Sequence, residues 1–337
     1  MSTVNHCFRL ASRPVGLPRR ADWAYGAEPV REPGDGELLV EVQYVSLDPA
    51  MRGWMNEAKS YLPPVQIGEV MRAYGAGRVL ASNYPGVAAG DSVTGAFGVQ
   101  ELATVPGKGA TKVDLGLAPL PVYLSVLGPT GMTAYFGLLD TGQAKAGDTV
   151  VVSAAAGAVG MAVGQIAKIK GCRAVGIAGG REKCDFIVRE LGFDAAIDYK
   201  AEDVKEALRR HCPQGLNVYF DNVGGEILDA ALSRLARGAR VVICGAISQY
   251  NSTEPVKGPA NYLALLVQRA SMKGMVVLDY ADRYAEAARE MAGWMAAGKL
   301  KSREDIVTGL ETFPDALLKL FRGENLGKLF LEVARQS

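Results

Sequence analysis

Residues 155–160, with the sequence AAGAVG, have the spacing in this chain that is most directly linked to chemistry. They match the dinucleotide fingerprint G-x-G-x-x-G with alanine at its first position. Gly157 would let the backbone approach a pyrophosphate, Gly160 would let the next helix pack closely on its strand, and the helix N-terminus would offer N–H groups to phosphate oxygens. Because the motif follows the β-branched run TVVVS, it predicts a dinucleotide coenzyme. The alternative is an ordinary βα turn kept small for packing.

The end of the following strand indicates which coenzyme. NAD sites usually carry Asp or Glu about 20 residues beyond the fingerprint, to bind the adenosine ribose. Here the run RAVGIA ends in Gly179 and Gly180, followed by Arg181, Glu182 and Lys183. Two small residues leave room for an anion and two cations offer it charge, so a ribose 2′-phosphate, and hence NADP, is favoured. Alternatively, these residues form a solvated first turn, or Glu182 supplies the missing acid.

Other catalytic patterns are weak or missing from the sequence. His6 and His211 lack a catalytic context, and there is no G-x-S-x-G, P-loop or H-E-x-x-H motif. No cluster has the spacing of zinc ligands. A hydroxyl or amide donor must therefore polarise the substrate. Tyr250 in CGAISQYN follows one expected strand and Asn222 in FDNVGG lies at the end of another, and open α/β sheets bind ligands at these ends. A half-exposed loop aromatic and a plain turn are the alternatives.

The elements that would position these residues change in character along the chain. Up to about residue 120 the sequence is β-rich and punctuated by turns, with Leu38, Val40, Val42 and Tyr44 on one side of a strand. Thereafter, expected strands at 149–154, 173–179, 195–199, 217–223 and 239–247 alternate with expected helices at 161–171, 181–192, 201–212 and 225–238. This alternation predicts a parallel sheet with right-handed crossovers. The apolar stretch 149–167 fits a buried strand, turn and helix better than a membrane span.

Composition limits the class of protein. The 337 residues fit about two domains, and a formal net charge of +1 gives no large field toward nucleic acid or a membrane surface. The five cysteines are scattered without a C-x-x-C pair, which argues against a disulfide framework. The first residues lack a basic region followed by an apolar stretch, so we expect no export signal. These features predict a cytoplasmic protein that acts on a small molecule.

Motifs along nearly the whole chain resemble one family. They are RLASRPVGLP, VSLDPAMRGWM, YLSVLGPTGMTAYFGLLD, SAAAGAVG, FDNVGGEILD, CGAISQYN and NLGKLF. The chain resembles the zinc-independent medium-chain dehydrogenase/reductases, in the branch of leukotriene 12-hydroxydehydrogenase/prostaglandin reductase and curcumin-reductase-like enzymes. The resemblance implies an α/β fold: a GroES-like β-barrel domain at 1–125, completed by 298–337, and a Rossmann domain at 126–297. It also implies a homodimer and the use of NADPH to reduce the C=C bond of α,β-unsaturated ketones and aldehydes.

The same resemblance implies site residues. Those that would line the cofactor are Thr133 beneath the nicotinamide, Ala158, Val159, Gly160 and Met161 at the pyrophosphate, Lys183 at the 2′-phosphate, Tyr199 at the adenosine, Asn222, Cys244, Gly245, Ala246, Ile247 and Ser248 at the nicotinamide side, and Met275, Val276, Val277 and Asn325 elsewhere in the cleft. They join Gly157 and Arg181, which the fingerprint and the charge pattern already indicate. On the substrate side, relatives commonly read DPYMRG where this chain has DPAMRG, so a tyrosine is replaced by Ala50. Arg52 and Trp54 are the neighbouring candidates for shaping that pocket.

The resulting hypothesis is an enone reductase. Hydride would pass to the β-carbon, and Tyr250 would stabilise the developing enolate by donating a hydrogen bond. Two alternatives remain: a quinone or alcohol oxidoreductase on the same scaffold, and a non-catalytic protein that senses NADPH.

Overall fold

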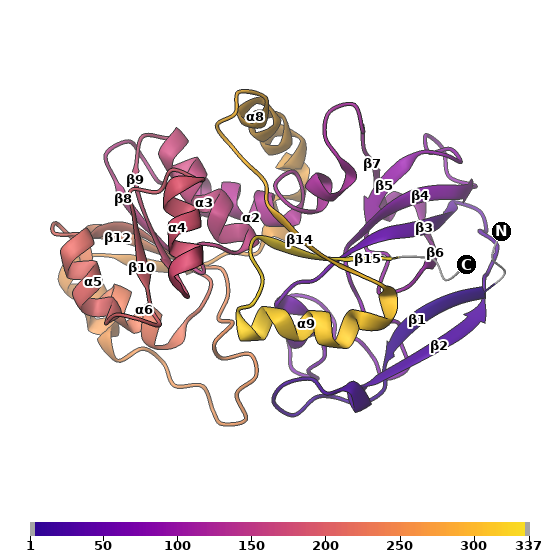
Figure 1. Ribbon diagram of the computed structural model, residues 1–337, viewed down its shortest axis with the longest axis horizontal. Helices are drawn as coiled ribbons and strands as arrows, with labels where there is room; N and C mark the ends of the chain where they lie inside the picture. Colours follow the sequence, from indigo (N-terminus) through magenta and orange to yellow (C-terminus); the bar gives the residue numbers. More distant parts are fainter. Residues whose placement is uncertain (1–3, 334–337) are drawn as a thin grey trace. The chain divides into compact units, whose positions relative to one another are not determined.

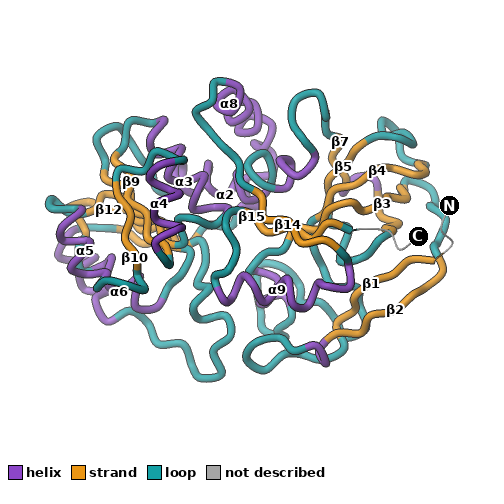
Figure 2. Tube along the Cα trace, viewed as in Figure 1, coloured by secondary structure: helices purple, strands orange, loops and turns teal. Residues whose placement is uncertain are grey.

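A computed structural model describes residues 4–333, and the chain divides into two compact units. One unit comprises Met1–Leu124 and Glu304–Ser337, and the other comprises Ser125–Arg303. Each has its own buried apolar core. The second unit is a parallel α/β structure, and the first consists mainly of strands (Figure 1; Figure 2).

The first unit is built around strand β3, which pairs with β4, β6 and β15 in a seven-stranded sheet. Its strands are β1 (Val4–Leu10), β2 (Trp23–Pro29), β3 (Glu37–Ser46), β4 (Gly75–Ser82), β5 (Ser92–Gly95), β6 (Leu102–Pro106), β7 (Ala110–Lys112), β14 (Glu304–Thr308) and β15 (Lys328–Glu332), and its helices are α1 (Ala50–Trp54) and α9 (Phe313–Arg322). The pairing of β3 with β4 shifts register between Leu39 and Val40 and between Val42 and Tyr44. These bulges bend the strand and bury both parities, so the strict alternation expected along β3 is interrupted.

The end of the chain is part of this first unit. Strand β15 runs antiparallel to β3, with Leu331 opposite Val45. Helix α9 begins at Phe313, whose ring packs against those of Phe8 and Trp23 at centroid distances of 5.2 and 4.9 Å. The segment from β14 to β15 therefore packs into the same apolar core as the strands of the first 124 residues.

The second unit contains a six-stranded parallel sheet in the order β10-β9-β8-β11-β12-β13. Its strands are β8 (Thr149–Ser153), β9 (Arg173–Ala178), β10 (Ala195–Asp198), β11 (Leu216–Asp221), β12 (Leu235–Ile243) and β13 (Ser271–Gly274), and its helices are α2 (Pro129–Phe136), α3 (Ala158–Ile169), α4 (Arg181–Arg189), α5 (Val204–His211), α6 (Gly225–Leu232), α7 (Ala264–Gln268) and α8 (Tyr284–Ala296). The order reverses between β8 and β11, so their carboxyl ends meet at a topological switch point. This confirms the predicted Rossmann-type sheet.

Helices cover this sheet on both faces. On one face, residues such as Val151 and Tyr219 join a core with Leu208 of α5 and Leu232 of α6. On the other face lie α3 and α4: a Cβ on Gly176 would meet the Ile187 side chain of α4 at 2.4 Å. Since both faces are buried, the strands are apolar almost throughout, which explains the continuous apolar run in the sequence.

Two expectations about this unit are corrected. The helix expected at 225–238 ends at Leu232, and strand β12 already begins at Leu235. The reason is that Leu235 pairs with Leu216 of β11, and glycine at position 238 adopts a positive φ of 72° within the strand. The five expected strands are joined by a sixth, β13, at the edge of the sheet. Among the described residues, no helix is long and apolar enough to cross a membrane.

Candidate functional site

The fingerprint residues form a tight turn between β8 and α3. Ala154 has a φ of 51°, in the left-handed region, and the Gly157 amide donates to the Ala154 carbonyl at 2.9 Å. Among the described residues, no side chain caps the N-terminus of α3. The first N–H groups of a helix have no partner within it. A Cβ on Gly160 would lie only 2.2 Å from the Ala154 oxygen. The turn therefore requires glycine there, and it presents backbone donors from Ala158, Val159 and Gly160. The Met161 amide already donates to the Gly157 carbonyl at 2.9 Å.

The turn between β9 and α4 has a different character. Gly180 has a φ of 96° and its amide donates to Asp198 Oδ1 at 2.8 Å. Arg181 is 91% exposed, and its nearest carboxylate lies at 3.7 Å on Asp185. Lys183 is half-buried in the first turn of α4. The turn thus places the two predicted cations on one short segment, and Glu182, the alternative acid, is exposed beside them.

Part of the room left by the small residues of this turn is used by an aromatic ring. A Cβ on Gly179 would lie 2.8 to 2.9 Å from ring atoms and the hydroxyl of Tyr199. Tyr199 itself is 44% exposed. The glycine therefore allows the Tyr199 ring to lie against the turn, and a partly exposed aromatic ring offers a surface on which an adenine base could stack.

The predicted nicotinamide-side residues come together at the ends of β11 and β12. Asn222 donates through Nδ2 to the Ser153 carbonyl at 2.8 Å, and its own carbonyl accepts from the Ile247 amide at 3.2 Å. The hydroxyl of Tyr250 accepts from the Ala246 amide at 3.1 Å. Ser248 donates to the Val223 carbonyl at 2.6 Å. The loop that follows β12 is thereby fixed to the turn that follows β11.

Burial affects the one thiol in this loop. Cys244 follows β12, and desolvation, with a smaller contribution from the charge of Asp221, raises the pKa of its thiol to about 12. At neutral pH the side chain is therefore a neutral thiol and a weak nucleophile.

A buried acid at this edge was missed by the sequence analysis. Asp221 is 1% exposed, and its Oδ1 accepts from Ser153 Oγ at 3.1 Å, Tyr219 Oη at 3.0 Å, the Val223 amide at 3.2 Å and the Gly224 amide at 3.0 Å. Burial raises the pKa of Asp221, while these hydrogen bonds oppose the rise. In the sequence, the indication of this acid is its position directly before Asn222 in FDNVGG.

The remaining predicted residues of this unit lie on neighbouring elements. Thr133 is in α2, and its hydroxyl donates to the Pro129 carbonyl at 2.7 Å. Met275 follows β13 and its amide donates to the Ile243 carbonyl at 3.1 Å. Val276 comes next, and Val277 opens a 3₁₀ segment, Val277–Arg283. Met275 and α2 approach the same ring: a Cβ on Gly137, directly after α2, would lie 2.6 Å from Phe220 and 3.4 Å from Met275.

Four predicted residues belong to the first unit. Ala50, Arg52 and Trp54 lie on α1. Arg52 is buried and donates to the carbonyls of Gly16 and Pro14 at 3.0 and 3.1 Å, so its guanidinium holds a backbone loop. Asn325 donates to the Gly327 carbonyl at 2.9 Å.

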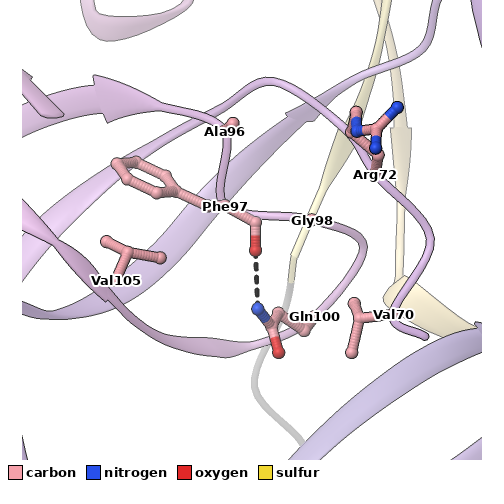
Figure 3. A pocket seen from close by; sticks show the side chains of 7 residues that line it. All are labelled: Val70, Arg72, Ala96, Phe97, Gly98, Gln100 and Val105. Carbon is pink, nitrogen blue, oxygen red and sulfur yellow. Dashed lines mark hydrogen bonds between the residues drawn. The ribbon is translucent and has the colours of Figure 1, made fainter. Parts of the chain in front are cut away.

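Trp54 is half-buried, and its indole Nε1 is buried with no hydrogen-bond partner within residues 4–333. The guanidinium of Arg72 lies 5.7 Å from the centroid of its ring. Arg72 also lines a hollow of about 250 Å³ in this unit, in which Gln100 donates to the Phe97 carbonyl at 2.6 Å (Figure 3). The hollow is bordered by Val70, Arg72, Ala96, Phe97, Gly98, Gln100 and Val105, and none of these was predicted as a site residue.

The histidines and cysteines are dispersed. His6 Nδ1 lies 2.9 Å from Glu101 Oε2 in the first unit, and His211 ends helix α5 of the second. All five cysteines are free thiols. Within the part of the chain that is described, no group of three or more His, Cys, Asp or Glu residues is placed to hold a metal ion.

The donor set at the carboxyl edge of the parallel sheet fits a dinucleotide. The turn after β8 offers amide donors at a helix N-terminus, the turn after β9 offers two cations beside small residues, and the segments after β11 and β12 enclose the switch point. Bound there, such a coenzyme would supply or accept a hydride.

Comparison with known proteins identifies the family. Residues 6–113 match the family described as the N-terminal domain of oxidoreductase, and residues 158–293 match the family described as zinc-binding dehydrogenase. The chain is 47% identical to a putative NADP-dependent oxidoreductase, YfmJ, of Bacillus subtilis (strain 168), with both chains fully covered. It is 44% identical to the NADPH-dependent curcumin reductase of Escherichia coli (strain K12), over 98% of this chain and 97% of the relative.

A solved structure agrees. CurA from Vibrio vulnificus in complex with NADPH superimposes with a TM-score of 0.93 at 45% identity, covering 98% of this chain and 99% of that one. The chain belongs to the medium-chain dehydrogenase/reductases, in their zinc-independent branch.

Proposed function

We propose that this protein uses NADPH to reduce the C=C bond of α,β-unsaturated ketones and aldehydes. The observation that carries the proposal is the fingerprint turn, with its uncapped α3 N-terminus, next to the cationic turn of Arg181 and Lys183. Relatives covering nearly the whole chain support it: one is an NADPH-dependent curcumin reductase, and another has been solved with NADPH. The unit Ser125–Arg303 would bind the coenzyme, and the other unit would select the substrate.

Tyr250 is the proposed donor to the carbonyl oxygen of the substrate. In an enone reduction, negative charge develops on that oxygen as the β-carbon receives hydride, so a donor aimed at it lowers the barrier. Tyr250 lies in the loop after β12, and its oxygen is held by the Ala246 amide at 3.1 Å. A hydroxyl that accepts one hydrogen bond keeps its own hydrogen to donate. The Ala246 contact would thus orient the donor.

The variant Tyr250→Phe tests this role. We expect turnover of a simple enone to fall by roughly 100- to 1000-fold, as for the loss of one such donor, while the Kd for NADPH changes little. The matched control is Tyr25→Phe, which removes the hydroxyl of a partly exposed tyrosine on β2. Turnover of Tyr250→Phe within about threefold of the parent protein would remove this residue from the mechanism.

A substrate panel tests the function itself. NADPH consumption is followed with an enone, a quinone and a secondary alcohol, and NADH is run in parallel. We expect the enone to be reduced fastest and NADPH to be preferred. Reduction of the quinone alone, or absence of turnover with every substrate, would replace the enone proposal by one of the alternatives.

We also propose that the protein forms a homodimer through the edge of its parallel sheet. Strand β13 is the last strand of that sheet, and its four residues are exposed. Exposed apolar side chains cluster on the preceding helical segments and on the edge strand: Tyr262, Leu263, Leu266, Val267 and Met272. Leu266 is 75% exposed and Val267 is 61% exposed. An open edge beside an apolar patch favours pairing with another chain.

Sedimentation of the variant Leu266→Glu tests this interface. We expect it to shift the protein toward monomers, because a buried carboxylate without a partner is costly. Leu115→Glu is the control, since Leu115 is 54% exposed on the other unit. Identical sedimentation of both variants would argue against this interface.

The thiols support a reducing compartment. Each of the five cysteines is free, and disulfides are common in proteins of oxidising compartments. We therefore propose a cytoplasmic location, which fractionation of cells with an antibody to the protein would test.

A further inference from the structure

Ser153 and Asp221 connect two turns of the candidate coenzyme site. Ser153 ends β8 and Asp221 ends β11, and these strands are adjacent, with Phe220 opposite Val152. Ser153 Oγ donates to Asp221 Oδ1 at 3.1 Å and accepts from the Asn222 amide at 2.9 Å. Ser153 is 0% exposed and Asp221 is 1% exposed, so water does not compete for these hydrogen bonds.

Asp221 also reaches the segment that follows β12. Its backbone carbonyl accepts from the amides of Cys244 and Gly245 at 2.9 and 3.1 Å. Its side chain accepts from the amides of Val223 and Gly224 in its own turn, at 3.2 and 3.0 Å. Asp221 therefore contacts its own turn and the segment after β12 directly. It contacts the strand end before the fingerprint turn through Ser153.

The partners of Asp221 are all neutral. No Lys, Arg or His nitrogen lies within 4.0 Å of its carboxylate in the described chain. A buried carboxylate without a cation is unfavourable for folding, so its presence calls for a reason other than stability. Its donors include two backbone amides of a turn that flanks the switch point, which indicates that the reason is the geometry of that turn.

We infer that Ser153 and Asp221 are positioning residues for the coenzyme: together they set the distance between the pyrophosphate turn and the nicotinamide-side segments. This inference rests on the proposed function, because it assumes that a dinucleotide spans both turns. Neither residue needs to touch the coenzyme. Loss of the link would let the two turns separate, and would therefore weaken a ligand that must contact both at once.

The chain offers a matched control at the opposite edge of the same two strands. Asn217 of β11 accepts through Oδ1 from the Thr149 amide of β8 at 2.8 Å. This is one side-chain hydrogen bond between the two strands, whereas Ser153 Oγ makes two, and it lies at their amino ends, away from the turns. Asn217→Ala and Ser153→Ala should therefore both lower the unfolding midpoint, whereas only Ser153→Ala should weaken binding of the coenzyme.

The experiment measures the Kd for NADPH and the KM for an enone in the full-length parent protein, Ser153→Ala, Asp221→Asn and Asn217→Ala. We expect the Kd for NADPH to rise about tenfold in Ser153→Ala and Asp221→Asn, and to stay within about twofold in Asn217→Ala. The KM for the enone should stay within about twofold in all four proteins. General destabilisation would not raise the Kd for NADPH and leave this KM unchanged. If Asp221→Asn does not fold, Ser153→Ala carries the test.

Two results would overturn the inference. One is an unchanged Kd for NADPH in Ser153→Ala, and the other is an equal weakening in Asn217→Ala. Failure of the proposed function is distinct from both, because the parent protein itself would then show neither NADPH binding nor enone reduction.

Discussion

Two buried carboxylates lie at opposite ends of the parallel strands, which are called the amino edge and the carboxyl edge of the sheet, and they have opposite kinds of partner. At the amino edge, Asp148 is buried and forms an ion pair with Arg240, which also donates to the carbonyls of Gly142 and Gln143 at 2.9 Å each. At the carboxyl edge, the donors to Asp221 within residues 4–333 are all neutral. At the amino edge, Arg240 thus neutralises the charge of Asp148 and holds the backbone at Gly142 and Gln143 in place. At the carboxyl edge, Asp221 fixes backbone turns without pairing its carboxylate with a cation, and so sacrifices stability for geometry.

The largest expected effect comes from removing the cation of the amino edge. In Arg240→Met, Asp148 loses its partner and stays buried, so the free energy of unfolding should fall by about 3 kcal/mol. Urea denaturation measures this loss. The Kd for NADPH should not change, because the pair lies at the edge away from the turns. A loss below about 1 kcal/mol would mean that the pair behaves like an exposed one and that the two edges do not differ in this way.

The next effect concerns backbone contact at the carboxyl edge. In Gly160→Ala, the added Cβ would lie 2.2 Å from the Ala154 oxygen and 2.8 Å from the Ala155 Cα, so the backbone must move. We expect a loss of about 2 kcal/mol in the free energy of unfolding and a large rise in the Kd for NADPH.

Gly293→Ala is the control for this substitution, since a Cβ on Gly293 of helix α8 would meet nothing within 4 Å. It should stabilise the protein slightly, by up to about 1 kcal/mol, through helix propensity. If Gly160→Ala kept both parental stability and parental NADPH affinity, the fingerprint turn would not depend on this close contact.

The smallest effect is a pH dependence that isolates Asp221. Burial raises its pKa in the folded protein above the ordinary value, so the folded state binds a proton more tightly than the unfolded state. This contribution is fully present below the unfolded pKa of about 3.9 and is lost as pH rises through the folded pKa. Relative to Asp221→Asn, the parent protein should therefore lose stability as pH rises from about 4 toward neutrality. Urea titrations of both proteins across this range measure the difference, and an opposite slope would show that the hydrogen bonds outweigh burial.

Local sequence features predicted much of the parallel sheet. The fingerprint turn, the cations after β9 and the positions of Asn222 and Tyr250 after strands could be located because each depends on a strand ending within a few residues. Strand β13 could not, since its sequence SMKG is short and exposed and is defined by pairing with β12. The first four residues of β12 are predicted as helix for a related reason. Leu235 continues the apolar period of α6, and only the pairing with β11 reveals the strand.

The role of Asp221 was beyond sequence reasoning for the same physical cause. Its partner Ser153 is 68 residues away, and the two meet only when β8 and β11 pair. In the first unit, the DPAMRG motif predicts Arg52 on the substrate side, and this stays a prediction. Its bonds to Gly16 and Pro14 have no local signal, because they arise from a loop more than 30 residues earlier. Polar residues whose function is to hold distant backbone together leave little local signature.

The state of the thiols has a consequence for the chemistry that we propose. Burial raises the pKa of Cys172, Cys184 and Cys212 to about 11, as it does that of Cys244 to about 12, and it also raises the pKa of Cys7. Conjugated carbonyl compounds are soft electrophiles that alkylate thiolates. A catalyst for such compounds that keeps its cysteine thiols protonated near neutral pH offers them little thiolate, and so would resist self-inactivation over many turnovers.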